Sequence, residues 1–119
     1  MDLQMLLDEY PKTATVIKQW LLDRMLEELK DDKLPENFKE MVRKEGITDD
    51  KVVGILEKSP RSMFDIFDSH KVFITVYPVR EQSYGAKVNN VDYQDRFSER
   101  IHADGFAVFE AFKILEAKL

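Results

Sequence analysis

The chain has 119 residues, of which 44% are hydrophobic and 34% charged, and its formal net charge is −5. This length and composition predict one globular domain over residues 1–119 that needs no disulfide or metal to fold. The absence of cysteine excludes thiol nucleophiles and zinc ribbons, and the negative charge opposes non-specific binding to nucleic-acid phosphates. The sequence has no apolar run near the roughly 18 residues of a membrane span and no basic leader, so we expect a cytoplasmic protein without membrane contact.

Helical signals dominate the amino-terminal half. A short helix is expected over 3–9, ended by Pro11, because the residue before a proline avoids the α region. Thr13 or Thr15 then starts a longer helix, in which apolar residues recur at spacings of three and four up to Leu29.

Proline and glycine delimit a third helix. Pro35 suits its first turn and Gly46 is placed to cap its end. Phe38, Met41 and Val42 form its narrow apolar stripe.

Two further helical starts follow. Thr48 can cap a fourth helix, with Ile47 and Val52 as a hydrophobic staple across its first turn. Ser59 and Pro60 then open a helix of one or two turns. Its apolar side is formed by Met63, Phe64 and Phe67.

The period changes at residue 71. β-branched and aromatic residues over 71–79 predict a strand, and Pro78 places its end at a sheet edge or a bulge. One face of that strand carries Val72, Ile74 and Val76. Two further strands are expected near 84–88 and 91–96, joined in a hairpin by the asparagines at 89–90, which tolerate positive φ.

The last helix has two possible starts. Ser98 can cap a helix that runs to about Lys118, or Asp104 can cap a shorter one starting at Gly105. For the longer helix, the core stripe is Ile101, Gly105, Val108, Phe112, Leu115 and Leu119.

Phenylalanine occupies every third position in this helix, and one core face cannot hold all three rings. Phe112 falls on the core stripe, Phe109 at its boundary and Phe106 about 140° away from Ile101. The interpretation that we favour is that the amino-terminal helices cover Phe106, and the alternative is a partner protein or a second copy of the chain. The candidate partner surface is therefore Phe106, Phe109 and Ile114.

These elements predict an α+β fold. A helical part over 1–69, with four or five short helices, packs with a β-β-β-α part over 70–119. The sheet is three-stranded and mainly antiparallel, and the carboxy-terminal helix is long.

Catalytic constellations are missing from the sequence. His70 and His102 are the only histidines, and no serine has a Gly-x-Ser-x-Gly context. Asp65, Asp68 and His70 could form a weak metal site, although a solvated helix face explains the same residues better. We therefore predict no catalytic residue, no metal site and no cofactor.

The second half offers a nucleic-acid hypothesis. Its order of helix, three strands and helix is that of the double-stranded-RNA-binding domain, which grips phosphates with a lysine cluster at its second helix. The corresponding segment, 98–104, holds Arg100 but also Glu99 and Asp104, so this cluster is missing. The candidate nucleic-acid surface is Arg80, Lys87, Arg96 and Arg100.

Several segments resemble small phage or prophage proteins of unknown function. They are Pro-Glu-Asn-Phe-Lys-Glu at 35–40, Gly-Ile-Thr-Asp-Asp at 46–50, the stretch 60–68, and parts of 100–116. Where such proteins carry alanine and glutamate in the last helix, this chain has Asp104, Gly105 and Phe106. The resemblance implies expression in a bacterial or phage-infected cell and gives no activity. The leading hypothesis is a non-enzymatic protein-binding module that engages an unidentified protein or itself.

Overall fold

The computed structural model describes residues 3–28 and 35–119, and it has the α+β fold that the sequence predicts. The elements in chain order are α1 (Leu3–Glu9), α2 (Pro11–Glu28), α3 (Glu36–Glu45), α4 (Asp49–Lys58), the 3₁₀ turn η1 (Pro60–Met63), α5 (Phe64–Ser69), β1 (Ile74–Arg80), β2 (Ser83–Val88), β3 (Val91–Asp92) and α6 (Arg100–Lys118).

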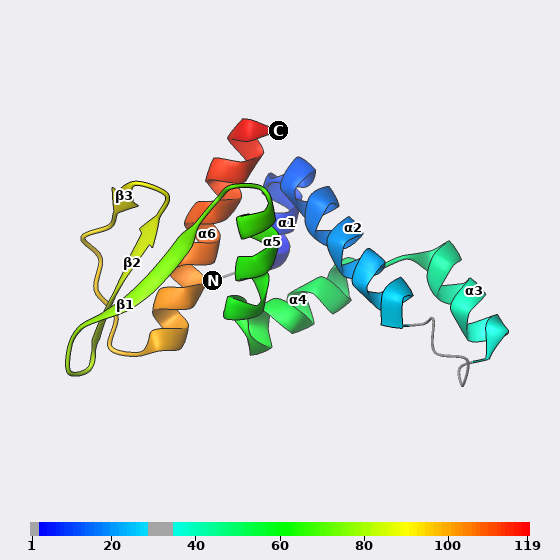
Figure 1. Cartoon of the computed structure of the whole chain (residues 1–119), viewed down its shortest axis with the longest axis horizontal. Helices are drawn as coiled ribbons and strands as arrows, with labels where there is room; N and C mark the ends of the chain where they lie inside the picture. Colours follow the sequence, from blue (N-terminus) through cyan, green and yellow to red (C-terminus); the bar gives the residue numbers. More distant parts are fainter. Residues whose placement is uncertain (1–2, 29–34) are drawn as a thin grey trace.

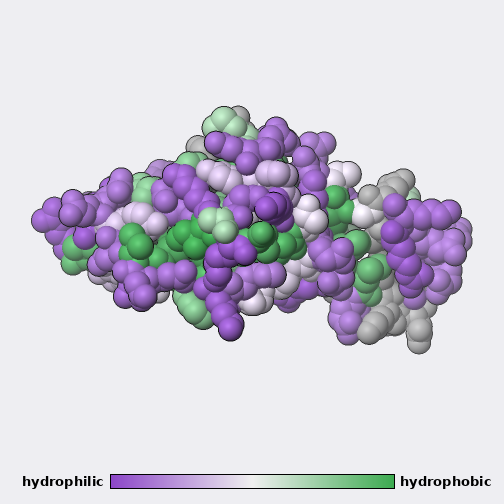
Figure 2. All heavy atoms as spheres, turned by 90° about the horizontal axis from the view of Figure 1, so that it is seen from above, coloured by the Kyte–Doolittle hydropathy of each residue, from purple (hydrophilic) through white to green (hydrophobic). Residues whose placement is uncertain are grey.

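The molecule is elongated, with extents of 50 × 30 × 24 Å. The sheet lies at one end and α3 at the other, while α6 runs beside the sheet and contacts α2, α5 and η1 (Figure 1). Seen from above, hydrophobic atoms gather in a belt over the half that holds the sheet and α6, whereas the α3 end is mainly hydrophilic (Figure 2). On this face of the molecule, the apolar surface therefore lies mainly over the half that is built around α6.

The sheet is antiparallel throughout, in the order β1-β2-β3. The sheet edge or bulge predicted from Pro78 is confirmed, since β1 is an edge strand whose register shifts between Pro78 and Arg80. The asparagine turn is also confirmed. Asn89 has a φ of 53°, and its side-chain oxygen accepts a hydrogen bond of 2.8 Å from the backbone N–H of Phe73. The turn thus ties the start of β1 to the end of β2.

A tyrosine covers a glycine on the outer face of the sheet. Tyr77 lies opposite Gly85, and a Cβ atom built on Gly85 would lie 2.8 Å from the Tyr77 ring. The Tyr77 hydroxyl donates a hydrogen bond to the carboxylate of Asp92 on β3. The side chain therefore spans all three strands above the position where β2 has no side chain.

The third strand is shorter than the predicted 91–96. It ends at Asp92, although the N–H of Tyr93 still donates to the carbonyl of Ala86 at 3.0 Å. Phe97 then returns to β2, where it exchanges two backbone hydrogen bonds with Tyr84, of 2.8 and 3.0 Å. The polar residues at 94–96, between Tyr93 and Phe97, are exposed and do not pair with β2, because they have no apolar face to bury.

The last helix begins at Arg100 with Glu99 in the cap position, close to the start predicted from Ser98. The alternative start at Gly105 is wrong, because Asp104 lies inside the helix. Gly105, Val108, Phe112 and Leu115 are buried as predicted. Ile101 and Leu119 are not core, being 45% and 44% exposed. They share the angle of the stripe but lie at the two ends of the helix, where the packed layers do not cover them.

Aromatic contacts fix Phe112 in the helical layer. Its ring centroid lies 5.6 Å from that of Phe67 on α5 and 6.3 Å from that of Tyr10 between α1 and α2. Burying these rings together is a main source of stability for this half of the molecule.

A carboxylate of α6 caps α2. The backbone N–H groups of Lys12 and Thr13 donate to Glu116 at 3.3 and 2.9 Å. These are first-turn amides that no intrahelical carbonyl can serve. The helix therefore begins at Pro11, earlier than the predicted start at Thr13 or Thr15.

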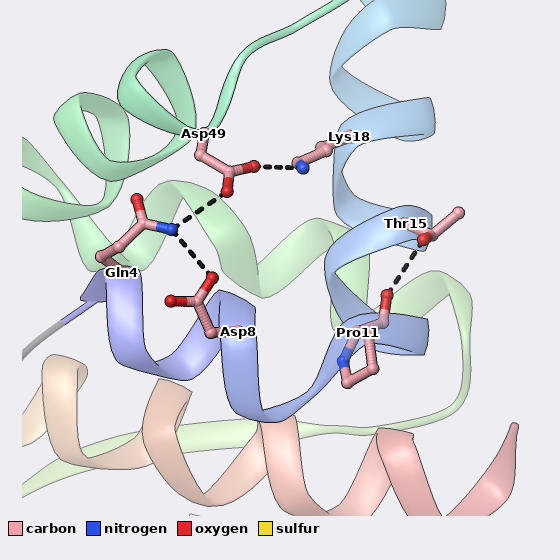
Figure 3. Close-up of polar contacts among 6 residues, drawn as sticks. All are labelled: Gln4, Asp8, Pro11, Thr15, Lys18 and Asp49. Atoms are coloured by element: carbon pink, nitrogen blue, oxygen red, sulfur yellow. Dashed lines mark hydrogen bonds and ion pairs between the residues drawn. The ribbon is translucent and has the colours of Figure 1, made fainter.

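Polar contacts join α1, α2 and α4. The Lys18 ammonium forms an ion pair with Asp49, and the side-chain amide of Gln4 donates to Asp49 at 3.0 Å and to Asp8 at 3.1 Å (Figure 3). Donation from Lys18, and then from Gln4, lowers the pKa of the Asp49 carboxyl. The first residue of α4 is thus held by α1 and α2.

The α3–α4 connection follows the sequence signals in part. Gly46 ends α3 with a φ of +67°, and both staple residues, Ile47 and Val52, are buried. Met41 is exposed and therefore does not belong to a buried stripe, a correction to the prediction. Leu29 and the side chains of the other two predicted stripe residues, Phe38 and Val42, lie outside the described part of the structure.

Candidate functional site

A groove of about 600 Å³ opens beside the amino-terminal half of α6. One wall comes from α6 and the segment before it, and the other from the starts of α1 and η1 and the end of α4. Its lining residues are Leu3, Glu57, Pro60, Phe97, Ile101, His102, Gly105, Phe106 and Phe109. Most of this lining is apolar, as is usual for a binding groove.

The α6 wall has a regular construction. His102, Gly105, Phe106 and Phe109 occupy positions i, i+3, i+4 and i+7 of one helix. Four residues at this spacing surround a single hole on a helix surface, the arrangement that accepts a knob side chain when two helices pack. Because Gly105 has no side chain, this hole is deeper than four ordinary residues would leave.

Aromatic rings support Phe106 from the side of the sheet. Its ring centroid lies 5.3 Å from that of Tyr93, edge to face, and 5.2 Å from that of Phe97. The favoured prediction, that the amino-terminal helices cover this ring, therefore needs correction. The segment after β3 packs against it, and the ring stays partly exposed along the groove.

The same segment is anchored to α6 by a polar contact. The Tyr93 hydroxyl lies 3.5 Å from the Glu110 carboxylate, to which it donates. Burial, and then the neighbouring Glu110 charge, raises the pKa of this hydroxyl, so it keeps its proton well above neutral pH. The support behind Phe106 is therefore unchanged over the physiological pH range.

Phe109 lies at the rim of the groove under a cation. The Lys113 ammonium is 4.3 Å from its ring centroid and 3.4 Å from Glu110. A cation over the ring face attracts the ring electrostatically. Ile114, the third residue of the predicted partner surface, is partly buried and does not line this groove. The structure thus brings Phe106 and Phe109 together and separates Ile114 from them.

An ion pair holds the two walls together. Arg61, next to Pro60, donates to the carboxylate of Asp104, next to Gly105, at 2.9 Å. The guanidinium also lies over the ring of Phe64, 5.0 Å from its centroid. The ion pair therefore joins η1 to α6 beside Gly105.

Glu57 and His102 are the ionisable residues in the described lining of the groove. His102 is exposed, and its Nε2 is 3.6 Å from the Glu99 carboxylate, while Glu57 projects from the last turn of α4. Across residues 3–28 and 35–119, no three histidine or acidic side chains are grouped so that they could hold a metal, and Asp65, Asp68 and His70 form no such group.

The four cations of the nucleic-acid hypothesis do not share a face. Lys87 lies on the outer face of β2 opposite Asp92, whereas Arg100 lies over the ring of Tyr84, which alternation along β2 places on the other face. Arg96 donates to the carbonyls of Tyr93 and Asp95, and Arg80 lies beyond the register shift of β1. Lys87 and Arg100, at least, therefore lie on different faces of the sheet.

Comparisons with known proteins add no functional information. No family model, curated protein or solved structure matches the chain. None of the helices in the described ranges is long and apolar enough to cross a membrane.

Sequence reasoning found two residues of the groove and missed the opposite wall. The spacing of His102, Gly105, Phe106 and Phe109 was visible in the sequence, and it could have indicated the hole. Other lining residues, such as Leu3 and Glu57, carry no local signal, since only the tertiary fold brings them to α6.

Proposed function

We propose that the chain is a non-enzymatic protein-binding module that takes an apolar segment of another protein into the groove on α6. The observation that carries the proposal is the pairing of a largely apolar groove with exposed hydrophobic rim residues. Ile101 is 45% exposed at this rim, and Phe106 and Phe109 are only partly buried. Contiguous exposed apolar surface of this kind typically marks an interaction site.

The character of the groove supports a protein rather than a polar metabolite as the ligand. Three phenylalanine rings, an isoleucine, a leucine and a proline contribute apolar contact area, while Glu57 and His102 are the ionisable groups in the described lining. Aromatic residues are enriched among those that dominate binding energy at protein interfaces. The resemblance to phage and prophage proteins supports a partner in a bacterial cell, either of the host or of the phage.

Affinity capture from a bacterial lysate tests the proposal. Phe109→Asp places a charge in the groove, and we expect it to reduce the captured amount of a specific protein at least tenfold. Phe73→Asp is the matched control, because Phe73 is 52% exposed and does not line the groove. Circular dichroism should show both variants folded.

The proposal fails if Phe109→Asp and Phe73→Asp capture the same proteins in the same amounts as the original chain. Ile101→Asp provides a second disruption at the exposed rim, where unfolding is not expected. Agreement between the two groove variants would separate a binding effect from a local packing effect.

A further inference from the structure

We infer that the segment bound in the groove is an amphipathic α-helix that inserts one large apolar side chain over Gly105 and places a lysine or arginine opposite Glu57. This inference rests on the proposed function and names the class of partner for the same groove.

The shape of the α6 wall favours a helix as the occupant. A knob side chain enters the hole among four residues at i, i+3, i+4 and i+7 when a second helix packs across the first. His102, Gly105, Phe106 and Phe109 form such a hole. The lining positions of α6 run from Ile101 to Phe109, which is about 12 Å at the helical rise, and this length matches about two turns of a partner helix.

The inserted side chain should be large and apolar. Gly105 contributes no side chain at the floor of the hole, and the rings of Phe106 and Phe109 form its sides. An aromatic or branched aliphatic side chain gains most from contact with the two rings, whereas a polar side chain would lose its hydration there. The Asp104–Arg61 ion pair joins the opposite wall to α6, and the groove is present in the chain without a partner.

Charge complementarity with Glu57 predicts a basic residue on the partner helix. Glu57 is exposed in the last turn of α4, where the carbonyl ends of the helix add a negative partial charge. None of the described lining residues is lysine or arginine, and the whole chain carries a net charge of −5. A cation on the partner can therefore pair with Glu57, whereas a second copy of the chain would bring another five negative charges and another Glu57.

Selection from displayed peptides tests the inference without a known partner. The probes are two randomised libraries, one on a fixed three-turn helical scaffold and one of linear peptides held extended by alternating prolines. Binders that are retained by the original chain and lost with Phe109→Asp are sequenced. We expect them to come from the helical library and to carry one large apolar residue with a lysine or arginine about one turn away.

Charge reversal with a selected peptide tests the predicted pairing between Glu57 and the basic residue of the peptide. Glu57→Lys should weaken binding at least tenfold at low salt, and changing the basic residue of the peptide to glutamate should restore most of that loss. Glu81→Lys is the matched control, because Glu81 is exposed in the turn between β1 and β2, away from the groove, and should leave affinity unchanged.

Filling the hole tests the knob. Gly105→Ala should weaken the same peptide at least tenfold while the affinity of a peptide with alanine at the knob position changes less. If Gly105→Ala unfolds the chain, Ile101→Asp at the rim replaces it.

Extended or acidic binders, or an affinity that Glu57→Lys leaves unchanged, would overturn the helix inference. The proposed function survives that result if the lysate capture still depends on Phe109. If the peptide preferences and the Phe109 dependence of the lysate capture are both absent, the helix inference and the proposed function fail together. The failure of the inference alone can therefore be distinguished from the failure of both.

Discussion

Arg61 on η1 and Asp104 on α6 form a two-point contact, with Nη2 donating to Oδ1 at 2.9 Å and Nε donating to Oδ2 at 3.3 Å. The Asp104 side chain is only 7% exposed, whereas Arg61 remains nearly half exposed. A carboxylate buried in a helix needs such a partner, because its desolvation is otherwise uncompensated. The pair therefore belongs to the framework of the groove, and its removal should be costly.

Asp104→Asn should lower the free energy of unfolding by about 2 kcal/mol, because it removes a charge-assisted hydrogen bond from a buried position. Urea denaturation followed by circular dichroism measures this change. Asp65→Asn is the matched control, since Asp65 is exposed on α5, and it should change the midpoint little. Equal midpoints for the two variants would show that the ion pair contributes nothing net.

Gly85→Ala should destabilise the sheet by about 1 kcal/mol through overpacking, because the added Cβ atom would collide with the Tyr77 ring. In a Tyr77→Ala background the same substitution should be neutral or slightly stabilising, since nothing covers the position and alanine restricts the unfolded chain more than glycine does. A double-mutant cycle measured by urea denaturation gives the coupling between the two residues. A coupling of zero would mean that the ring does not lie over Gly85 in solution.

The contribution of Asp49 to stability should disappear in acid. Lys18 and Gln4 lower the pKa of its carboxyl below the ordinary value of 3.8, so the folded state favours the ionised form. This stability is present above pH 3.8 and is lost as the pH falls through the lower folded-state pKa. We expect Asp49→Asn to be less stable than the original chain at pH 7 and the difference to shrink as the pH falls below 3.8.

Unfolding curves in urea at pH 7, 5 and 3 measure that difference directly. Asp50→Asn serves as the control, because Asp50 is exposed on the same turn of α4 and should show a smaller change with pH. A gap between the original chain and Asp49→Asn that stays constant over these pH values would contradict the assignment.

Local backbone signals explain why much of the fold could be predicted from the sequence. Pro11, Gly46 and Pro78 each restrict the chain in a way that depends on neighbouring residues alone. The two asparagines at 89–90 set a two-residue turn, and that turn sets the register of the strands on either side. These predictions needed no knowledge of what packs against each element.

The errors arose where a residue depends on partners distant in the sequence. Ile101 and Leu119 have the right angle on α6, but helical periodicity says nothing about where along the axis the covering layers end. Asp104 was considered as a helix cap because no local signal shows that it pairs with Arg61, which lies 43 residues earlier. The third strand was overextended because Phe97, and not the residues before it, completes the pairing with β2.

In the candidate site, too, residues with a local signal could be predicted, whereas residues that depend on distant partners could not. The angle of Phe106 and Phe109 on the last helix marked them as residues that need a cover or a partner, and they do line the groove. The opposite wall comes from Leu3, Glu57 and Pro60, which only the folded chain brings near them. A groove made by two distant segments has no signature in either segment alone.

The contact between Glu116 and the first turn of α2 also bears on how the chain folds during synthesis. The ribosome delivers α6 after every element that packs on it, and the amides of Lys12 and Thr13 lack their carboxylate until then. Phe67 and Tyr10 likewise have no Phe112 to pack against before α6 emerges. Until α6 has emerged, the earlier helices and the hairpin lack these contacts, so we expect them to be more accessible to proteases than they are in the folded chain.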